Sequence, residues 1–392
     1  LKIIKLINAD ENFSKEFKNF ILYPGQIDSI NLEDEGKNFQ NLNFDIFFKI
    51  NNLKKATINS SPVLEDFSKI NSDSYIYETK SLEKYFNLDH ENKTIIPKNK
   101  KTVIDEDVFL PKSYELKLFE NYHIDLINGS SVISKSSFEL NGKTNKRILI
   151  SSSDNSSPGI LILNTVKENI LNFVTFENFN NISTKNRKTL GAISIYNSKI
   201  IIDNCIFKNN KSEDSLNIIS SDFKIFNSVF KNSSSDSLDL DFSDGIMNNV
   251  SFIKSKNDAI DISGGEVKMK NIFITEAGDK AISSGEKNIL AGSDIILTNN
   301  AIGIASKDLS NISLTRVLFK NNQLAISAYQ KKKAYGPSKI YLYEYKLDKN
   351  EKDFLIEEKS QLFVNDNEAK LQKYKNVELL MYGNLYGAKT LK

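Results

Sequence analysis

The stretch SSSDSLDLDFSDGIMNNVSFIKSKNDAIDIS, residues 233–263, carries the same short pattern at both ends. DSLDLD at 236–241 and DAIDIS at 258–263 both have apolar residues at their third and fifth positions, and their separation gives a repeat of about 22 residues. The same spacing continues in both directions through residues 192–329. The apolar column that it defines begins with Ile193, one position earlier than the repeat requires, and continues with Leu216, Leu238, Ile260, Ile282, Ile304 and Ile326.

Repetition at a fixed period of roughly 20 residues is typical of stacked units that are each too small to bury their own apolar face. The apolar residues recur at i and i+2, as in strands, and the i, i+3, i+4 spacing of a helix is missing. We therefore predict an all-β fold, a right-handed parallel β-helix with about 22 residues per coil. Two further columns support it, namely Phe207, Phe230, Phe252, Ile274, Ile296 and Leu318, and Asn204, Asn227, Asn249 and Asn271. We expect the Asn side chains to point inward and to bond coil to coil.

The period also suggests how the chain is divided. Residues 106–345 carry the period and predict nine or ten coils. Residues 1–105 lack it and alternate in places like half-buried strands, so we expect a small, mostly-β N-terminal domain with a short helix at 11–22. Residues 346–392 break the period, and we expect a C-terminal cap with a hairpin at 352–366. A cap is needed because the open end of a solenoid exposes unpaired backbone groups and apolar side chains.

The composition argues against several classes of partner. Lys and Arg number 52 and Asp and Glu number 50, so the net charge of +2 gives no global field that attracts nucleic acid or a membrane surface. No apolar run is long enough to cross a bilayer, so no transmembrane helix is expected. Cys205 is the single cysteine, and its place inside the repeat favours a packed residue over a nucleophile. The sequence begins with Leu1, which fits either a removed signal peptide or a trimmed chain.

The strand pattern places a group of carboxylates on one outer face of the solenoid. If Leu238 points inward, Asp239 and Asp241 point outward, and the same rule makes Asp261 point outward in the next coil. Adjacent strands lie about 4.8 Å apart, so Asp239 and Asp261 should be direct neighbours. A turn column beside them contains Asp214, Asp236, Asp258 and Lys280. The patch expected on this face consists of Asp236, Asp239, Asp241, Asp258, Asp261, Lys280, Glu286, Lys307 and Tyr329.

Stacked carboxylates oppose folding unless something compensates for their charge. Like charges directly opposite each other across a ladder are destabilising, and two close carboxylates ionise together only with a cation or a shared proton. Asp residues in the turn column have a structural interpretation, since Asp often caps backbone groups in turns. Asp239 and Asp261 fit a functional role better, because Asp is depleted in the middle of strands.

The repeat resembles that of the pectate-lyase-like β-helix superfamily, which includes polysaccharide lyases, polygalacturonase-type hydrolases, epimerases, phage tailspikes and non-catalytic surface proteins. Four consecutive coils are similar to those of the hydrolases, whose pattern is N-T-D, G-D-D, G-H-G and R-x-K. SSDSLDL, KNDAIDI and IASK place Asp236, Asp258 and Lys307 at family positions. Three positions depart from the pattern and argue against pectin hydrolysis: Asn257 replaces an Asp, Lys280 a His and Ala305 an Arg.

Two functions stay open at this point. The first is a carbohydrate-active hydrolase or lyase that acts on a long, anionic polysaccharide, with an acid and a base that flank the bond. Its catalytic residues would come from Asp236, Asp239, Asp258, Asp261, Lys280 and Lys307, and its substrate-binding residues would be Glu286, Tyr329 and Lys331. The alternative is a non-catalytic surface, adhesive or assembly solenoid in which Asp239, Asp241 and Asp261 hold Ca²⁺ or a glycan. Either function implies a secreted or cell-surface protein.

The shape of the acidic face separates these two functions. A groove beside it, walled by the loops at 181–191 and 331–338, favours the enzyme. A flat face with ions between the coils favours the alternative.

Overall fold

The computed structural model describes residues 2–8, 13–21, 44–49, 56–60, 79–180, 191–383 and 386. The chain divides into two compact units. The first contains residues 1–77 and 185–187, and the second contains residues 78–184 and 188–392.

The first unit contains a four-stranded antiparallel sheet with the strand order β2-β1-β3-β4. The short helix predicted at residues 11–22 is wrong, because this segment pairs along β1 as strand β2. Backbone pairing with a neighbouring strand overrides the helix propensity of the Lys and Glu residues in this segment. The strands are β1 (Lys2–Asn8), β2 (Phe13–Ile21), β3 (Phe44–Lys49) and β4 (Ala56–Ser60).

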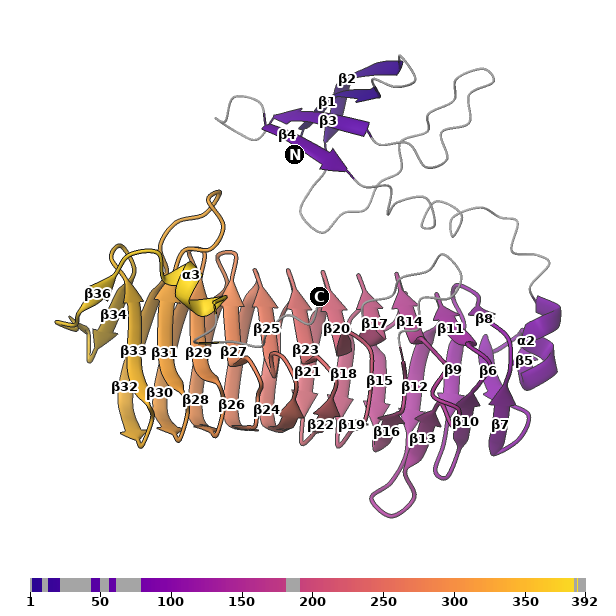
Figure 1. Cartoon of the computed structure of the whole chain (residues 1–392). Helices are drawn as coiled ribbons and strands as arrows, with labels where there is room; N and C mark the ends of the chain where they lie inside the picture. The colour runs from indigo at the N-terminus through magenta and orange to yellow at the C-terminus, as the bar shows by residue number, and fades with distance from the viewer. Residues whose placement is uncertain are drawn as a thin grey trace. The chain divides into compact units, whose positions relative to one another are not determined.

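The second unit is a parallel β-solenoid of about 12 turns with about 22 residues per coil, as the period predicts. Two sheets extend along its whole length (Figure 1). The helix α2 (Thr79–Tyr85) lies at its N-terminal end, where Leu82 and Tyr85 are buried. The first sheet consists of β8 (Val108–Leu110), β11 (Ser131–Ser134), β14 (Gly159–Leu163), β17 (Gly191–Tyr196), β20 (Asp214–Ile219), β23 (Asp236–Asp241), β25 (Ile260–Ser263), β27 (Lys280–Gly285), β29 (Ile302–Lys307), β31 (Leu324–Tyr329), β33 (Lys352–Glu357) and β36 (Lys373–Tyr374).

The second sheet supplies the remaining sides of each coil. It consists of β5 (Phe86–Asp89), β6 (Thr94–Pro97), β7 (Lys101–Ile104), β9 (Glu115–Leu118), β10 (His123–Leu126), β12 (Ser137–Asn141), β13 (Ile148–Ser151), β15 (Asn169–Asn172), β16 (Val174–Glu177), β18 (Ile200–Asp203), β19 (Ile206–Lys208), β21 (Asp222–Phe226), β22 (Val229–Ser233), β24 (Asp244–Ser255), β26 (Glu266–Thr275), β28 (Ile289–Thr298), β30 (Asn311–Lys320), β32 (Lys339–Asp348), β34 (Gln361–Val364) and β35 (Asn367–Glu368).

Within residues 106–345 the first sheet has ten described strands, β8 to β31, in agreement with the nine or ten coils predicted there, but the solenoid extends beyond these bounds. The strands β6 and β7 lie before residue 106 and already pair in parallel with β9 and β10 of the following coils. Parallel pairs also continue after residue 345, where β33 joins β31 and β34 joins β32. These end coils lack the regular spacing, because their turns differ in length. The boundary predicted near residue 105 falls within this run of strands, and the division into domains stays a prediction.

The main apolar column is confirmed. Leu238 pairs with Ile260, and every member of the column from Ile193 to Ile326 is at most 1% exposed. The second column is confirmed only as far as Ile274. The next coil is longer by one position, so Ile274 pairs with Leu297, and Ile296 is 42% exposed. The aromatic part of this column forms a stack with centroid distances of 5.1, 4.6 and 4.8 Å between Phe176, Phe207, Phe230 and Phe252.

The asparagine column does not point inward as predicted. Asn249 donates to Asn227 at 2.8 Å and Asn271 donates to Asn249 at 3.2 Å, both on the exposed surface. All of these residues have positive φ, from 47° to 58°, which Asn tolerates because its short side chain can bond locally. An inward ladder of side-chain amides occurs in another column, which consists of Asn300, Asn322 and Asn350.

The hairpin predicted at 352–366 is also wrong. Its two strands are β33 and β34, which pair with the preceding coil and not with each other. The chain then forms the short helix α3 (Val377–Met381), which lies over β29, β31 and β33 (Figure 1). The side chains of Val377 and Met381 are buried there in a second apolar cluster, separate from the interior core.

Candidate functional site

The first sheet places the predicted carboxylates together on its outer side. Asp239 and Asp261 are direct partners in adjacent parallel strands, while Leu238 and Leu240 are fully buried on the inner side. Asp241 follows two residues after Asp239 and pairs with Ser263. The alternation of the strand therefore produces the stack of outward carboxylates that the sequence predicts.

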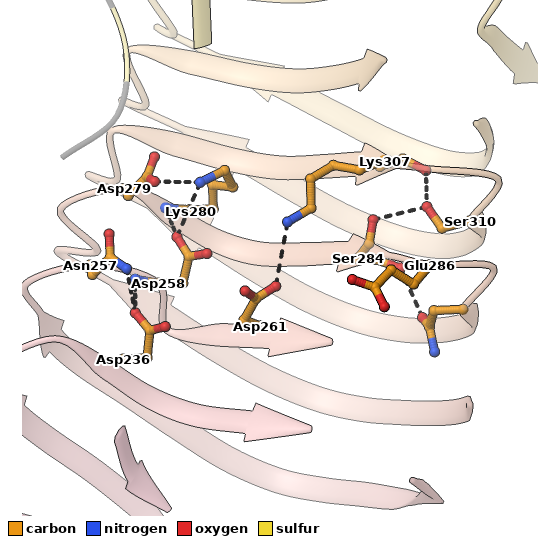
Figure 2. Close-up of polar contacts among 12 residues, drawn as sticks. Asp236, Asn257, Asp258, Asp261, Asp279, Lys280, Ser284, Glu286, Lys307 and Ser310 are labelled. Carbon is orange, nitrogen blue, oxygen red and sulfur yellow. Dashed lines mark hydrogen bonds and ion pairs between the residues drawn. The ribbon is translucent and has the colours of Figure 1, made fainter. Parts of the chain in front are cut away.

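The turn column caps backbone groups from coil to coil. A carboxylate oxygen of Asp236 accepts a bond of 2.8 Å from the backbone N–H of Asp258 and a bond of 2.7 Å from the side chain of Asn257. Asp258 accepts a bond of 2.8 Å from the backbone N–H of Lys280 in the same way. Figure 2 shows this chain of bonds. The structural interpretation of Asp236 and Asp258 is therefore correct, and a catalytic role for them stays a prediction.

Two lysines enter the same face from the following coils. The ammonium of Lys280 lies between two carboxylates, 3.5 Å from Asp258 and in a short ion pair with Asp279 (Figure 2). The ammonium of Lys307 lies 3.6 Å from Asp261. Lys280 is 2% exposed and Lys307 is 8% exposed, so both charges are largely shielded from water. The face thus changes from carboxylates to ammonium groups along the solenoid.

Burial raises the pKa of most members of this carboxylate cluster. It raises the pKa of Asp239 to about 10, and the charges of Asp214 and Asp241 add to this effect. Burial together with Asp261 raises the pKa of Asp241 to about 6. Burial raises the pKa of Asp258 to about 7, although Lys280 opposes it. Burial and neighbouring carboxylates also raise the pKa values of Asp214 and Asp236 well above the usual range.

Asp261 has the opposite electrostatic environment. Burial acts to raise its pKa, but the charges of Lys307 and Lys280 outweigh burial. The pKa of Asp261 therefore lies below its usual range. For Lys280, Asp258 and Asp279 likewise outweigh burial and raise the pKa of its ammonium. A neutral carboxyl group and an ionised one are consequently adjacent on the outer face, at Asp239 and Asp261.

The predicted substrate-binding residues surround the cationic end of this face. Glu286 forms a short ion pair with Lys332. Tyr329 is fully buried, and its hydroxyl lies 3.2 Å from the hydroxyl of Tyr382. The ring of Tyr382 lies beside two ammonium groups, with its centroid 4.5 Å from Lys331 and 5.3 Å from Lys280.

Three carboxylates are close enough to share a cation. Asp236, Asp258 and Asp261 each offer an oxygen, and these oxygens lie within 4.8 Å of one another. This group shares only Asp261 with the predicted metal-binding set of Asp239, Asp241 and Asp261. Carboxylate oxygens suit Ca²⁺, but the ammonium groups of Lys280 and Lys307 already contact two of the three residues.

Sequence reasoning missed several residues of this face. Asn217 donates to Asp239 at 2.9 Å, and Ser283 pairs with Asp261. Both lie one repeat away from those Asp residues, so the repeat contained the signal. Asp279 carried a weaker signal, since it precedes Lys280 in a turn. Tyr382 lies outside the period, and nothing in the sequence pointed to it.

A shallow cleft of about 320 Å³ lies at the turns that follow β14, β17 and β20, and it is not the groove that we expected beside the acidic face. None of its lining residues belongs to the loops at 181–191 or 331–338. The first of these loops, except for Gly191, lies outside the described residues.

Cys205 has the structural role predicted for it. It is fully buried, and its thiol lies 3.4 Å from the backbone oxygens of Leu171 and Asp203. Burial raises the pKa of the thiol to about 12, so the nucleophilic thiolate is suppressed.

Comparisons with known proteins identify only distant likenesses. No protein-family model matches the chain, and no curated protein matches it significantly. A solved structure of the periplasmic alginate epimerase AlgG is similar over 75% of this chain and 89% of its own, with 10% identity and a TM-score of 0.46. The enzymatically active domain of tailspike protein 2 of bacteriophage CBA120 is similar over 67% of this chain and 48% of its own, with 9% identity and a TM-score of 0.41.

A third solved structure is similar at the same low level. The catalytic domain of a GH87 α-1,3-glucanase covers 74% of this chain and 66% of its own, with 13% identity and a TM-score of 0.40. At such identities and scores, neither a substrate nor a residue role is carried over to this chain. The solenoid is therefore assigned from its own strand pairing. In the described part of the chain, the helices are too short or too polar to span a bilayer.

Proposed function

We propose that this solenoid is a carbohydrate-active protein that cleaves a long, anionic polysaccharide on the outer face of its first sheet. One observation carries the proposal: Asp239 and Asp261 are adjacent outward carboxyl groups, but Asn217 contacts the first and Lys307 the second, and these surroundings shift their pKa values in opposite directions. Neighbouring titratable groups whose pKa values are pushed apart are the arrangement that acid and base roles require. Such a protein would be secreted or on the cell surface, where polysaccharides are met.

The roles follow from the protonation states. Asp239 holds its proton at neutral pH, so it is the candidate acid that protonates the leaving oxygen of the glycosidic bond. Asp261 is ionised beside Lys307, so it is the candidate base or nucleophile. Lys280 and Lys307 are the candidates for binding a substrate carboxylate, which gives the preference for an anionic polymer.

A polysaccharide panel tests this proposal. The purified full chain is incubated with uronate-containing and neutral polysaccharides, while reducing ends and the absorbance of unsaturated products are recorded. Hydrolysis yields the first signal alone, and elimination yields both. Asp239→Asn and Asp261→Asn should each lose turnover, while Asp222→Asn, at a side chain 62% exposed and outside the patch, should keep it. Full turnover by both site variants overturns the proposal.

A second candidate function rests on the three carboxylates that lie within 4.8 Å of one another. In this case Asp236, Asp258 and Asp261 hold Ca²⁺, and the solenoid is a non-catalytic surface protein. Asp258 has a raised pKa, so binding of a cation would release protons, and the affinity would rise with pH. Calorimetry with Ca²⁺ in buffers of different ionisation enthalpy measures this release. Absence of binding at millimolar Ca²⁺ excludes this alternative.

A further inference from the structure

The C-terminal helix covers part of the same outer face. Ala305, Tyr329 and Leu355 lie at outward positions, since their neighbours Ile304, Ala328 and Ile356 belong to the interior core. All three outward side chains are nevertheless fully buried. Val377 and Met381 of α3 belong to the same apolar cluster and are themselves at most 1% exposed. Helix α3 therefore shields an apolar surface directly beside the two lysines.

Tyr382, the residue after the helix, extends this cover to the ammonium groups of Lys280 and Lys331. Tyr382 lies against Lys280 and Lys331 with its ring and against Tyr329 with its hydroxyl. Asp239, Asp241 and Asp261 remain partly exposed. The carboxylate end of the face is thus partly accessible to solvent, whereas its cationic end is covered.

We propose that the segment Val377–Tyr382 is a removable cover that keeps Lys280 and Lys307 from anionic groups in solution. When the segment detaches, two buried ammonium groups become available at the end of the carboxylate stack. Cleavage of an anionic polymer at this face, as proposed above, would then depend on this opening. The inference rests on the proposed function only in this last step.

The attachment of the segment is weak enough for it to open. Helix α3 has five residues, and so short a helix is stable only through its packing. Its N-cap residue Asn376 has a left-handed conformation with φ of 53° and makes no capping bond with its side chain. Val377 and Met381 are the two fully buried side chains of the helix, and Leu380 packs half-buried against the same cluster, while Leu379 is 71% exposed. Elements with few buried contacts open at a much lower free energy than the core of a protein.

Chemical labelling of lysines tests the cover without any substrate. Met381→Asp places a charge in the apolar cluster and should release the segment, while Leu379→Asp alters the same helix at its exposed side. Acetylation of individual lysines by acetic anhydride is followed by mass spectrometry, with the exposed Lys268 as the internal reference. We expect the labelling rate of Lys280 to rise by about tenfold or more in Met381→Asp and to stay unchanged in Leu379→Asp.

Two further measurements make the outcomes distinct. Met381→Leu keeps an apolar side chain at this position, so labelling of Lys280 should stay slow. Circular dichroism should show that the solenoid remains folded in all variants. Two results would overturn the cover. One is labelling of Lys280 as fast as that of Lys268 in the wild type. The other is an equal labelling rate of Lys280 in Met381→Asp and in the wild type. Polygalacturonate is then added as the probe. Tighter binding by Met381→Asp supports both proposals, whereas freed lysines without binding support the cover and contradict the proposed function.

Discussion

At the scale of single residues, the outer face shows how position alone separates two identical side chains. Asp239 and Asp261 occupy equivalent places in adjacent coils. Asp239 accepts a hydrogen bond from Asn217 and lies among other carboxyl groups, whereas Asp261 is reached by Lys307 from two coils further along. The repeat makes the two positions geometrically equal, and the lysine makes them chemically different.

The first prediction concerns the pH dependence of stability through Asp239. Its pKa is about 10 in the folded state, whereas an Asp side chain in an unfolded chain has a pKa of about 4. As pH rises between these values, the unfolded state loses the proton first, so stability falls. Asp239→Asn cannot titrate, and its Tm should fall less than that of the wild type between pH 5 and pH 8. Thermal unfolding across this range, with Asp222→Asn as the control, measures the difference, and parallel curves would show that Asp239 is not protonated.

The second prediction is that Asp261→Asn lowers the free energy of unfolding at neutral pH. The variant leaves the buried ammonium of Lys307 without its carboxylate partner, and removal of one member of a buried pair costs about 3 kcal/mol. The contribution of Asp261 is present above its usual pKa and is lost as pH falls, because its folded-state pKa is lowered. Urea unfolding at pH 7 measures the loss. The double variant Asp261→Asn, Lys307→Met should recover part of it, and a single variant as stable as the wild type would contradict the ion pair.

At the scale of elements, the phenylalanine stack is a regular part of the core. Phe230 lies between Phe207 and Phe252 with ring planes within 9° of parallel. Phe230→Ala should lower the free energy of unfolding by about 3–5 kcal/mol, because it leaves a cavity inside the stack. Phe242→Ala, at a side chain 51% exposed, should change it by about 0.5 kcal/mol or less. Denaturant titration of both variants tests the difference, and equal losses would mean that the stack does not stabilise the coils.

The elements also show how far the sequence could predict this structure. The columns through Leu238 and Asp239 were predictable, because strand alternation and a constant coil length fix which side each residue occupies. Ile296 was misplaced because one coil has an extra residue, and a shift of one residue moves a side chain to the other face. The direction of the Asn side chains was predicted wrongly, because turn residues with positive φ and inward residues recur with the same period, and the spacing does not separate them. Helix α3 could not be placed, because its contacts with the outer face are not periodic.

At the scale of the whole molecule, the ionisable groups of the outer face change from carboxyl to ammonium along the solenoid axis. Carboxyl groups occupy β20, β23 and β25, and the ammonium groups follow on β27 and β29. From β23 to β31 there are four steps between strands, so the patch is about 19 Å long. A polymer that lies along this axis would meet the carboxyl groups and the ammonium groups in a fixed order, and it would therefore bind in one direction.

This length gives the last prediction, which rests on the proposed function. The affinity for uronate oligosaccharides should rise with chain length until an oligomer spans the patch and should then stay constant, because longer chains reach no further charged groups of the patch. Calorimetry with a graded series of oligogalacturonates measures the rise, and neutral oligosaccharides of the same lengths are the control. Lys307→Met should lower the affinity of the long oligomers more than that of the short ones, since a short oligomer can bind without reaching β29. Equal affinities for a monomer and a long oligomer would place the binding site in a pocket for a single sugar and not along the face.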